Sequence, residues 1–129
     1  MPSPESHRFW QEGRKNPQFG AVGNEFNLHG LRGRMAERQE PVGKDVECIL
    51  SDIGGISGHW VVASGADPDC RLLYLHGGGY VSGSGAHYLH LAAQISAAAQ
   101  CAVLLADYRL APEHPFPDGL EDCIRATNG

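Results

Sequence analysis

The feature that most constrains this chain is a short apolar run that ends in a histidine and three glycines. Residues 72–75 have the pattern of a buried strand, and the sequence His-Gly-Gly-Gly follows directly at positions 76–79. Glycines in such a turn let backbone N–H groups approach a negative charge with no side chain in the way. A tight turn alone would need one glycine, so three in succession indicate a site that stabilises negative charge.

Two kinds of glycine-rich turn bind negative charge after a strand, one for phosphate and one for the oxyanion of an acyl-transfer reaction. The phosphate patterns are absent from the sequence. There is no G-x-x-x-x-G-K-[ST], and Ser82 stands where the third glycine of G-x-G-x-x-G would be. His-Gly-Gly-Gly after a strand is the type of motif found in lipases and esterases. The sequence therefore favours an oxyanion hole.

The residues before the motif predict a β-hairpin. Strand-like runs at Val46–Leu50 and Ile56–Ala63 are separated by the turn signal Gly54-Gly55. A second turn is expected over residues 65–69, followed by the strand that leads into the motif, Arg71–His76. This third strand is unbroken in its hydrophobicity, so both of its faces are expected to be covered.

The residues after the motif predict a helix, a strand and a second helix. Ser84 is expected to cap the first helix, and Cys101–Ala106 to form a buried strand. The last helix, from about Asp118, is expected to pair Glu121 with Arg125. The side chains expected to face inward are Tyr88, Leu91, Ala92, Ile95 and Ala99 on the first helix and Leu120, Cys123 and Ile124 on the last. A strand, a crossover helix and a strand make the last two strands parallel, so the fold class is α/β.

Residues 1–42 differ in pattern from the rest and are predicted to form a helical arm on a core of residues 43–129. A first helix is expected at Ser3-Pro4-Glu5 and a second from about Asn24. The apolar side of the second helix would carry Leu28, Leu31 and Met35.

Composition excludes several classes of function. The net charge of −5 provides no basic field for nucleic acid or an anionic membrane. No window reaches the roughly 18 apolar residues of a membrane span, and the N-terminus lacks the pattern of a signal peptide. Four widely spaced cysteines indicate reduced thiols and a cytoplasmic location. His87 and His90 lie at i, i+3 with no third ligand placed by spacing, so no metal or other cofactor is expected.

Two motifs together resemble the hormone-sensitive-lipase-like group of α/β-hydrolases, which are carboxylesterases. They are residues 76–80 (His-Gly-Gly-Gly-Tyr) and residues 107–117 (Asp-Tyr-Arg-Leu-Ala-Pro-Glu-His-Pro-Phe-Pro), in the family's order and one crossover helix apart. The resemblance implies the N-terminal part of an α/β-hydrolase fold: a helical cap arm, a β-hairpin and then a βαβα unit. It gives residues 1–42 the role of a cap over the acyl site.

The resemblance also implies roles for the first motif. Gly78 and Gly79 would present N–H groups to the tetrahedral intermediate, and Gly77 would allow the turn. His76 would brace the loop by hydrogen bonds, and Tyr80 would line the acyl pocket or fix the loop.

In the second motif, Asp107, Arg109 and Glu113 lie where the fourth strand meets its loop. An ion-pair and hydrogen-bond network is expected there, holding the oxyanion loop in place. Ordinary loop anchoring by Asp107 and Arg109 is an equally open alternative.

The family's nucleophile lies in G-x-S-x-G on a following strand, and its triad runs in the order Ser, Asp/Glu, His. No serine of this chain has glycines two residues to either side, so no residue is assigned a catalytic role. We expect a fragment, truncated before the nucleophile strand, that cannot form an acyl-enzyme alone. Its full-length parent would hydrolyse small acyl esters.

Such a truncation would leave Leu72–Leu75 as an open sheet edge and expose Leu104, Leu105 and the last helix. Self-association through the edge is therefore expected. Two alternatives to an esterase parent stay open. The parent could be a non-catalytic receptor for small ligands with the same fold, or the short chain could itself be a subunit that pairs through its edge.

Overall fold

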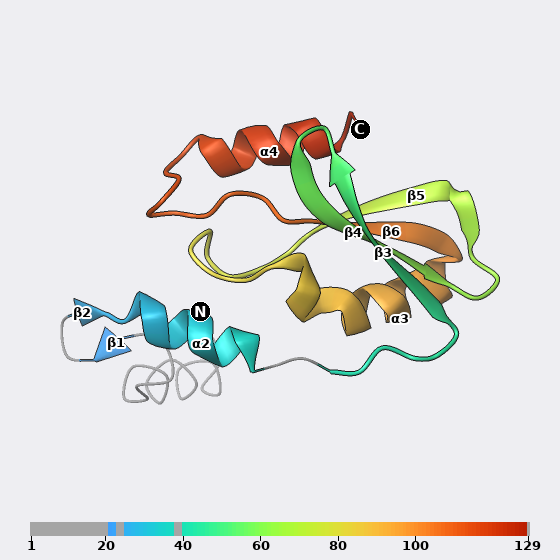
Figure 1. The fold of residues 1–129 in the computed structure, drawn as a ribbon, viewed down its shortest axis with the longest axis horizontal. Coiled ribbons are helices and arrows are strands. Elements are labelled where there is room, and N and C mark those ends of the chain that lie inside the picture. Colours follow the sequence, from blue (N-terminus) through green and yellow to red (C-terminus); the bar gives the residue numbers. More distant parts are fainter. Residues whose placement is uncertain (1–20, 23–24, 38–39, 129) are drawn as a thin grey trace, which may run out of the picture.

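The computed structural model of the chain describes residues 21–22, 25–37 and 40–128. A four-stranded sheet in the order β3-β4-β6-β5 forms the centre of this part (Figure 1). Its strands are β3 (Val46–Ile53), β4 (Ile56–Ala63), β5 (Asp67–Leu75) and β6 (Cys101–Ala106). Neighbours β3, β4 and β6 pair antiparallel, whereas β5 runs parallel to β6. The α/β class and the parallel pair are confirmed.

The predicted hairpin is formed by β3 and β4. Gly54 and Gly55 connect them with φ of 61° and 85°, the left-handed conformation that a two-residue hairpin turn requires at both positions. Asp52 accepts a hydrogen bond from the Gly55 N–H at 2.8 Å, which fixes the turn. The register places Ile53 opposite Ile56, and both side chains are buried.

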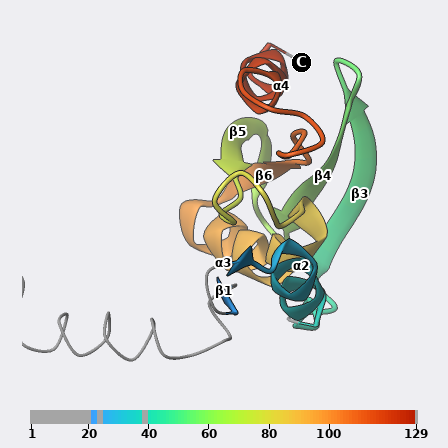
Figure 2. The ribbon, with the colours of Figure 1, turned by 90° about the vertical axis from the view of Figure 1, so that its left-hand side faces the viewer.

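Helices cover the two faces of the sheet, and β6 is the strand that both sides share. A 3₁₀ turn, η2 (Gly85–Tyr88), leads into α3 (Leu89–Ala99) on one face, and α4 (Asp118–Ala126) lies on the other (Figure 2). Side chains alternate along β6 because successive residues of a strand point to opposite faces. Val103 and Leu105 pack with α3, and Leu104 and Ala106 pack with Ala126 of α4.

The arm contributes one described helix, α2 (Leu28–Ala36), preceded by the short pair β1 (Ala21–Val22) and β2 (Glu25–Phe26). The predicted start near Asn24 is wrong. The helix begins at Leu28 because Asn27 occupies the N-cap position, where its side chain accepts from Gly30 N at 2.8 Å. The helix predicted at Ser3-Pro4-Glu5 lies outside the described residues.

The prediction that the third strand is covered on both faces is wrong. Its core residues Leu72 to Tyr74 are half-buried, and Leu75 is 47% exposed. In the described part of the chain β5 is an edge strand, paired only with β6, so its side chains lack neighbours on one side. The strand also begins earlier than predicted, because Asp67 already pairs with Cys101 and the turn ahead of it is shorter than residues 65–69.

The predicted inward face of α3 is confirmed in part, because Ala92 is buried and Tyr88 and Ile95 pack against the core. Leu91 and Ala99 are exposed, and the buried positions are Ala92, Ala93 and Ser96. The Ser96 hydroxyl is buried because it is satisfied on both sides: it accepts from Ala63 N at 2.9 Å and donates to Cys101 O at 2.6 Å. Apolar periodicity did not predict this position because Ser96 is polar.

Ser84 does lie at the N-cap of η2, but its hydroxyl makes no capping hydrogen bond to the backbone. The Ser84 Oγ lies 3.3 Å from His87 Nδ1 instead. The capping role predicted for this side chain is therefore wrong.

The inward face of α4 is also different from the predicted one. Leu120 and Ile124 are exposed, Cys123 is half-buried, and the buried residues are Asp122 and Ala126. The helix therefore buries one small residue, Ala126, and one charged residue, Asp122, rather than its larger apolar side chains.

Two further predictions about this region are wrong. Arg125 pairs with Asp122 at 2.8 Å rather than with Glu121. Leu104 and Leu105 are 4% and 0% exposed, because α3 and α4 each cover one face of β6. The exposed apolar side chains lie elsewhere, among them Leu75 on β5, Leu50 on β3 and Ile124 on α4.

Candidate active site

The glycine loop connects the end of β5 to η2, and its backbone is held through three successive carbonyl groups. The His76 carbonyl accepts from the Tyr108 hydroxyl at 2.5 Å. The Gly77 carbonyl faces His76 Nδ1 at 3.0 Å and accepts from the Tyr88 hydroxyl at 3.2 Å. The Gly78 carbonyl accepts from Ser82 Oγ at 2.8 Å and from the N–H groups of Ser82 and Val81 at 3.1 and 3.2 Å.

This anchoring sets the direction of the amide groups. In a trans peptide the C=O and the following N–H point in opposite directions. Tying the carbonyls of Gly77 and Gly78 to the protein therefore turns the N–H groups of Gly78 and Gly79 away from those anchors. Among the described residues neither N–H has an acceptor. The loop thus presents two consecutive N–H donors for which no group of the described residues competes.

Glycine is required at two positions of this loop. Gly78 has φ +139°, and a Cβ there would lie 1.9 Å from the Ser82 carbonyl oxygen. Gly83 has φ +99°, and its Cβ would lie 2.6 Å from both Gly77 O and His76 Nδ1. Gly79 has φ +63° with open space around it, so only the backbone conformation favours glycine there.

His76 lies beneath the loop and is 4% exposed. Its ring stacks on Tyr108 with centroids 4.3 Å apart and an interplanar angle of 12°, and Tyr88 lies on it at 5.8 Å. Burial lowers the pKa of His76, which keeps the ring neutral at physiological pH. The neighbouring Gly77 carbonyl assigns the tautomer with the proton on Nδ1. His76 is placed to brace the loop.

Tyr108 is the main anchor that sequence reasoning missed, although it lies inside the second motif. Its ring is buried against His76 and its hydroxyl holds the His76 carbonyl. Burial raises the pKa of Tyr108 to about 12, so the hydroxyl stays a donor throughout the physiological range. The signal was an aromatic residue with a polar tip directly after a buried strand.

We expect Tyr108→Phe to destabilise the chain by about 1–2 kcal/mol, because the buried His76 carbonyl loses its donor. Urea unfolding followed by circular dichroism measures this. Tyr74→Phe is the matched control. Tyr74 is half-buried on β5 and its hydroxyl makes no hydrogen bond among the described residues, so a change below about 0.5 kcal/mol is expected there. Equal effects of the two substitutions would contradict the anchoring role.

The three charged residues of the second motif do not form one network. Asp107 accepts from Gly85 N at 2.5 Å, which fixes the start of η2, and its other oxygen lies 3.6 Å from His59 Nδ1. Arg109 pairs with Asp122 on α4 at 2.8 Å. Glu113 pairs with Arg32 on α2 at 2.7 Å. Each of the three thus fastens a different segment around the glycine loop.

A cavity of about 490 Å³ opens between the end of β5, the glycine loop and α4. Its lining is mostly apolar and includes Leu75, Tyr80, Tyr108 and Phe116. Tyr80 is 78% exposed, so its ring forms part of the rim while its carbonyl accepts from Ala111 N at 2.9 Å. Both roles expected for Tyr80 are compatible with this position.

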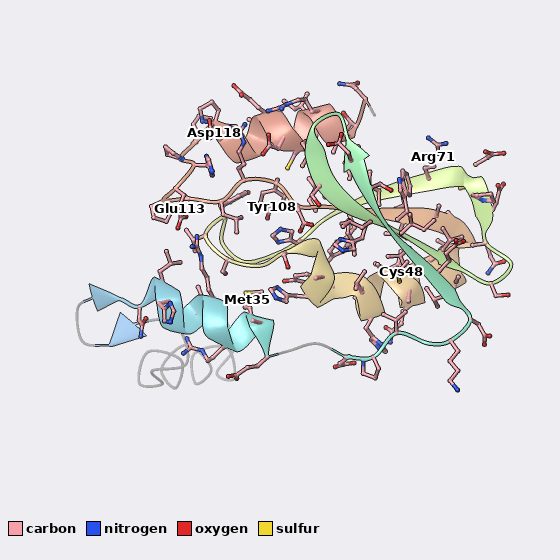
Figure 3. All side chains as sticks on the ribbon, in the orientation of Figure 1. Met35, Cys48, Arg71, Tyr108, Glu113 and Asp118 are labelled. Carbon is pink, nitrogen blue, oxygen red and sulfur yellow. The ribbon has the colours of Figure 1, made fainter. Side chains whose placement is uncertain are left out.

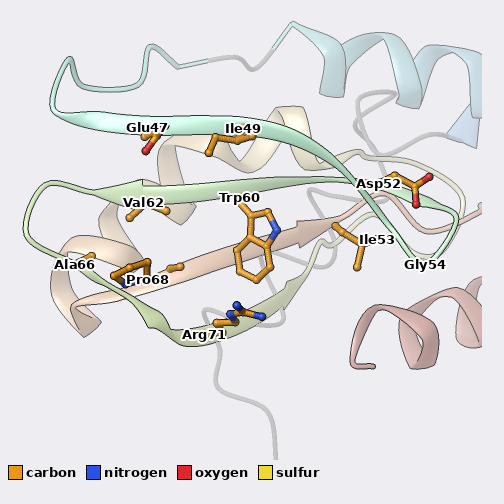
Figure 4. Close-up of a pocket in the computed structure, with 11 residues that line it drawn as sticks. Glu47, Ile49, Asp52, Ile53, Gly54, Trp60, Val62, Ala66, Pro68 and Arg71 are labelled. Atoms are coloured by element: carbon orange, nitrogen blue, oxygen red, sulfur yellow. The ribbon is translucent and has the colours of Figure 1, made fainter. Parts of the chain in front are cut away.

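A second cavity, of about 520 Å³, lies over β3, β4 and β5 on the face of the sheet against which α4 packs (Figure 4). Trp60 and Arg71 form its floor, with the guanidinium 5.5 Å from the indole centroid. Ile49 and Val62 complete an apolar strip beside them. It shares no residue with the glycine loop and has no part in the chemistry considered for that loop.

Within the described ranges, no group of three His, Cys, Asp or Glu side chains is placed to hold a metal ion. His90 lies near the Pro41 carbonyl and Glu40, and His87 near Ser84. In the same part of the chain, no helix has the length and apolar character needed to cross a membrane.

Comparison with known proteins places the chain among hydrolases. A family model described as alpha/beta hydrolase fold matches residues 72–129. The chain is 42% identical over 111 residues to an acetyl-hydrolase of Streptomyces hygroscopicus and 45% identical over 108 residues to esterase LipI of Mycobacterium tuberculosis. These matches cover 79% and 78% of the chain but 37% and 34% of the relatives, so it spans little more than a third of their length.

Solved structures agree with this placement. The protein EstE5, in a crystal soaked with p-nitrophenyl butyrate, superposes with a TM-score of 0.78 at 37% identity, covering 98% of this chain and 42% of EstE5. An esterase from the bacterial hormone-sensitive lipase family superposes with a TM-score of 0.72 at 34% identity, covering 99% of this chain and 42% of that esterase. The likeness extends over nearly the whole chain and less than half of each neighbour.

Proposed function

This chain belongs to the hormone-sensitive-lipase-like α/β-hydrolases and corresponds to the N-terminal part of their fold, and from this premise we propose that it supplies the oxyanion hole of an esterase. The donors are the N–H groups of Gly78 and Gly79. The substrate class is small acyl esters, as the names of the acetyl-hydrolase and esterase relatives suggest.

One observation carries this proposal: the carbonyls of Gly77 and Gly78 are tied to the protein, which turns the next two N–H groups away from these anchors, and neither N–H has an acceptor among the described residues. When a nucleophile attacks an ester carbonyl, the negative charge develops on its oxygen. Donors fixed beforehand need no reorganisation at that moment, and each contributes about 10²–10³ in rate. The mostly apolar cavity beside the loop suits a short acyl group.

The rest of the reaction needs a serine, a histidine and an acid in suitable geometry. The 129 residues contain no G-x-S-x-G, so the chain alone is expected to show no ester turnover above background. A receptor lacking the triad is not favoured by any observation made on this chain. The cytoplasmic location and the cap role of residues 1–42 remain predictions within the same proposal.

A chimera tests the proposal. This chain replaces the matching segment of the Streptomyces acetyl-hydrolase, which then supplies the remainder of the fold. Hydrolysis of p-nitrophenyl acetate by the purified chimera, with none by the chain alone, is the expected result. A chimera that folds, by circular dichroism and gel filtration, but hydrolyses no ester would overturn the proposed role of this glycine loop. Turnover by the chain alone would contradict the expected lack of activity.

We also propose that the chain self-associates through β5, because the outer side of this strand is unpaired in the described structure and Leu75 beside it is exposed. Gel filtration over a range of concentrations should show species larger than the 13.9 kDa monomer. Leu75→Lys should restore the monomer, since a lysine on an edge strand opposes pairing. Leu50→Lys is the matched control on the opposite edge strand, β3, and should have no effect. A monomer at every concentration would contradict this prediction.

A further inference from the structure

One side chain of the arm contacts both the glycine loop and the second motif. Arg32 lies in the middle of α2 and is separated by 49 and 81 residues in sequence from the groups that it binds. Its Nε donates to the Val81 carbonyl at 2.8 Å, and its Nη2 donates to the Ala111 carbonyl at 3.1 Å. Its two terminal nitrogens also pair with both oxygens of Glu113 at 2.7 and 2.8 Å. Figure 3 labels Glu113 on the loop between β6 and α4, above α2.

The residue that Arg32 holds in the glycine loop is itself part of the anchoring. Val81 and Ser82 provide all three hydrogen bonds that fix the Gly78 carbonyl. Arg32 binds the carbonyl of Val81, and Met35, one turn further along α2, places its Sδ 3.2 Å from Ser82 Oγ, whose proton goes to the Gly78 carbonyl. The helix therefore contacts the loop at the two residues that orient the Gly79 N–H.

The second motif is joined at the same point. Ala111 N donates to the Tyr80 carbonyl at 2.9 Å, and the Ala111 carbonyl accepts from Arg32. Arg32 thus links α2 to both the glycine loop and the loop after β6. A planar guanidinium can make these bonds together because its five N–H groups point in fixed, different directions. A lysine would supply one point charge and could not replace the whole set.

We propose that Arg32 is a positioning residue that couples the seating of α2 to the donor geometry of the glycine loop. Docking of the arm and formation of the oxyanion site are then one event, and an arm that moves away leaves the loop without this support. An effect of Arg32 on catalysis rests on the proposed function. Its effect on the glycine loop depends only on the contacts described above.

The ion pair between Arg32 and Glu113 is stable over the physiological pH range. The hydrogen bond from Arg32 is the main reason that the pKa of Glu113 is lowered to about 2. A backbone hydrogen bond at Glu113 and the charges of Arg32 and His114 lower it further, and His114 itself faces Asp118. Because the pKa is depressed in the folded state, the stabilisation is complete above the ordinary carboxyl pKa and is lost as the pH falls toward 2. We therefore expect the loop to be held unchanged from pH 5 to 8 and to loosen only in acid.

Hydrogen exchange on the full chain tests the coupling and needs no catalysis. The reporters are the amides of Val81, Ser82 and Ala111, and the reference is Val103 in the buried strand β6. Arg32→Gln should accelerate exchange at the three reporters by about tenfold or more, while exchange at Val103 stays unchanged. Arg32→Lys should rescue little of this protection. The matched control is Arg34→Gln on the same helix, because the Arg34 side chain has no hydrogen bond among the described residues.

Further outcomes decide the proposal. Unchanged exchange at the reporters in Arg32→Gln, or equal acceleration at Val103, would overturn it. Should that variant fail to fold, Glu113→Gln keeps the Val81 bond and should give a smaller acceleration confined to Ala111. In the chimera, Arg32→Gln should lower kcat more than it raises KM. Selective exchange in a chimera without esterase activity would leave the coupling standing and remove the proposed function.

Discussion

Gly78→Ala is expected to abolish most of the esterase activity of the chimera and to destabilise the chain. A Cβ at this position would lie 1.9 Å from the Ser82 carbonyl oxygen and 2.6 Å from its carbon. Ser82 is fully buried and bonded to the Gly78 carbonyl, so relief requires the loop itself to move. The φ of +139° adds strain, because side chains rarely adopt it.

We expect a loss of about 2–4 kcal/mol in the free energy of unfolding from the clash and strain. The rate of ester hydrolysis should fall by about 10²–10³, the effect of losing one oxyanion donor. Urea unfolding of the chain and initial rates of the chimera measure the two effects. Gly79→Ala is the control, since its Cβ would meet nothing within 4 Å and only left-handed strain of about 1 kcal/mol is added. If the two alanine variants behaved alike, the packing of Ser82 against Gly78 would not be what shapes the loop.

Asp122→Ala is expected to cause the second large loss. Asp122 is 2% exposed on α4 and accepts from the backbone N–H and the guanidinium of Arg109 and from Arg125. Removing the carboxylate leaves these donors without their buried partner. Breaking such pairs costs about 3–5 kcal/mol when both groups are buried, so about 2–3 kcal/mol is expected here because Arg109 is about a third exposed.

Asp118→Asn provides the matched control, since Asp118 also approaches Arg109, at 3.3 Å, but from a more exposed position. A loss below about 1 kcal/mol is expected there. The hydrogen bond from Arg109 is the main reason that the pKa of Asp122 is lowered in the folded state. The effect of Asp122→Ala should therefore be complete at neutral pH and shrink in acid, as the carboxyl becomes protonated below its ordinary pKa. Equal losses in the two variants, or a pH-independent difference, would contradict this account.

The strands were predictable because their signals are local. The run Cys101–Ala106 is apolar throughout and is buried at every position. The Gly54-Gly55 turn fixed the hairpin, since few other residues accept positive φ at both positions. The glycine loop was equally evident, because a turn after a strand rarely needs three successive glycines for its own geometry.

The helix faces were not predictable from apolar spacing. On α4 the buried position is the carboxylate Asp122, whose burial depends on an arginine from a different segment. On α3 the buried hydroxyl of Ser96 depends on acceptors and donors in two strands. Periodicity counts hydrophobic residues and cannot register a polar group that becomes buried through a distant partner.

The same limit applies to the site. The sequence predicted which backbone groups would be donors but not what orients them. Tyr108, Ser82 and Arg32 do this through contacts between segments up to 81 residues apart in sequence. The expected network among Asp107, Arg109 and Glu113 was instead three separate attachments, because each side chain found a nearer partner.

The exposure of Tyr80 and Phe116 has a consequence for how such a protein can diversify. These side chains are 78% and 84% exposed beside the cavity, so replacing them costs the fold little. The donor groups belong to the main chain, which substitution cannot adjust in small steps. Laboratory evolution of this scaffold can therefore change ligand preference gradually through side chains at the rim. The backbone of the glycine loop offers no such gradual change, because a substitution either preserves its conformation or disrupts it.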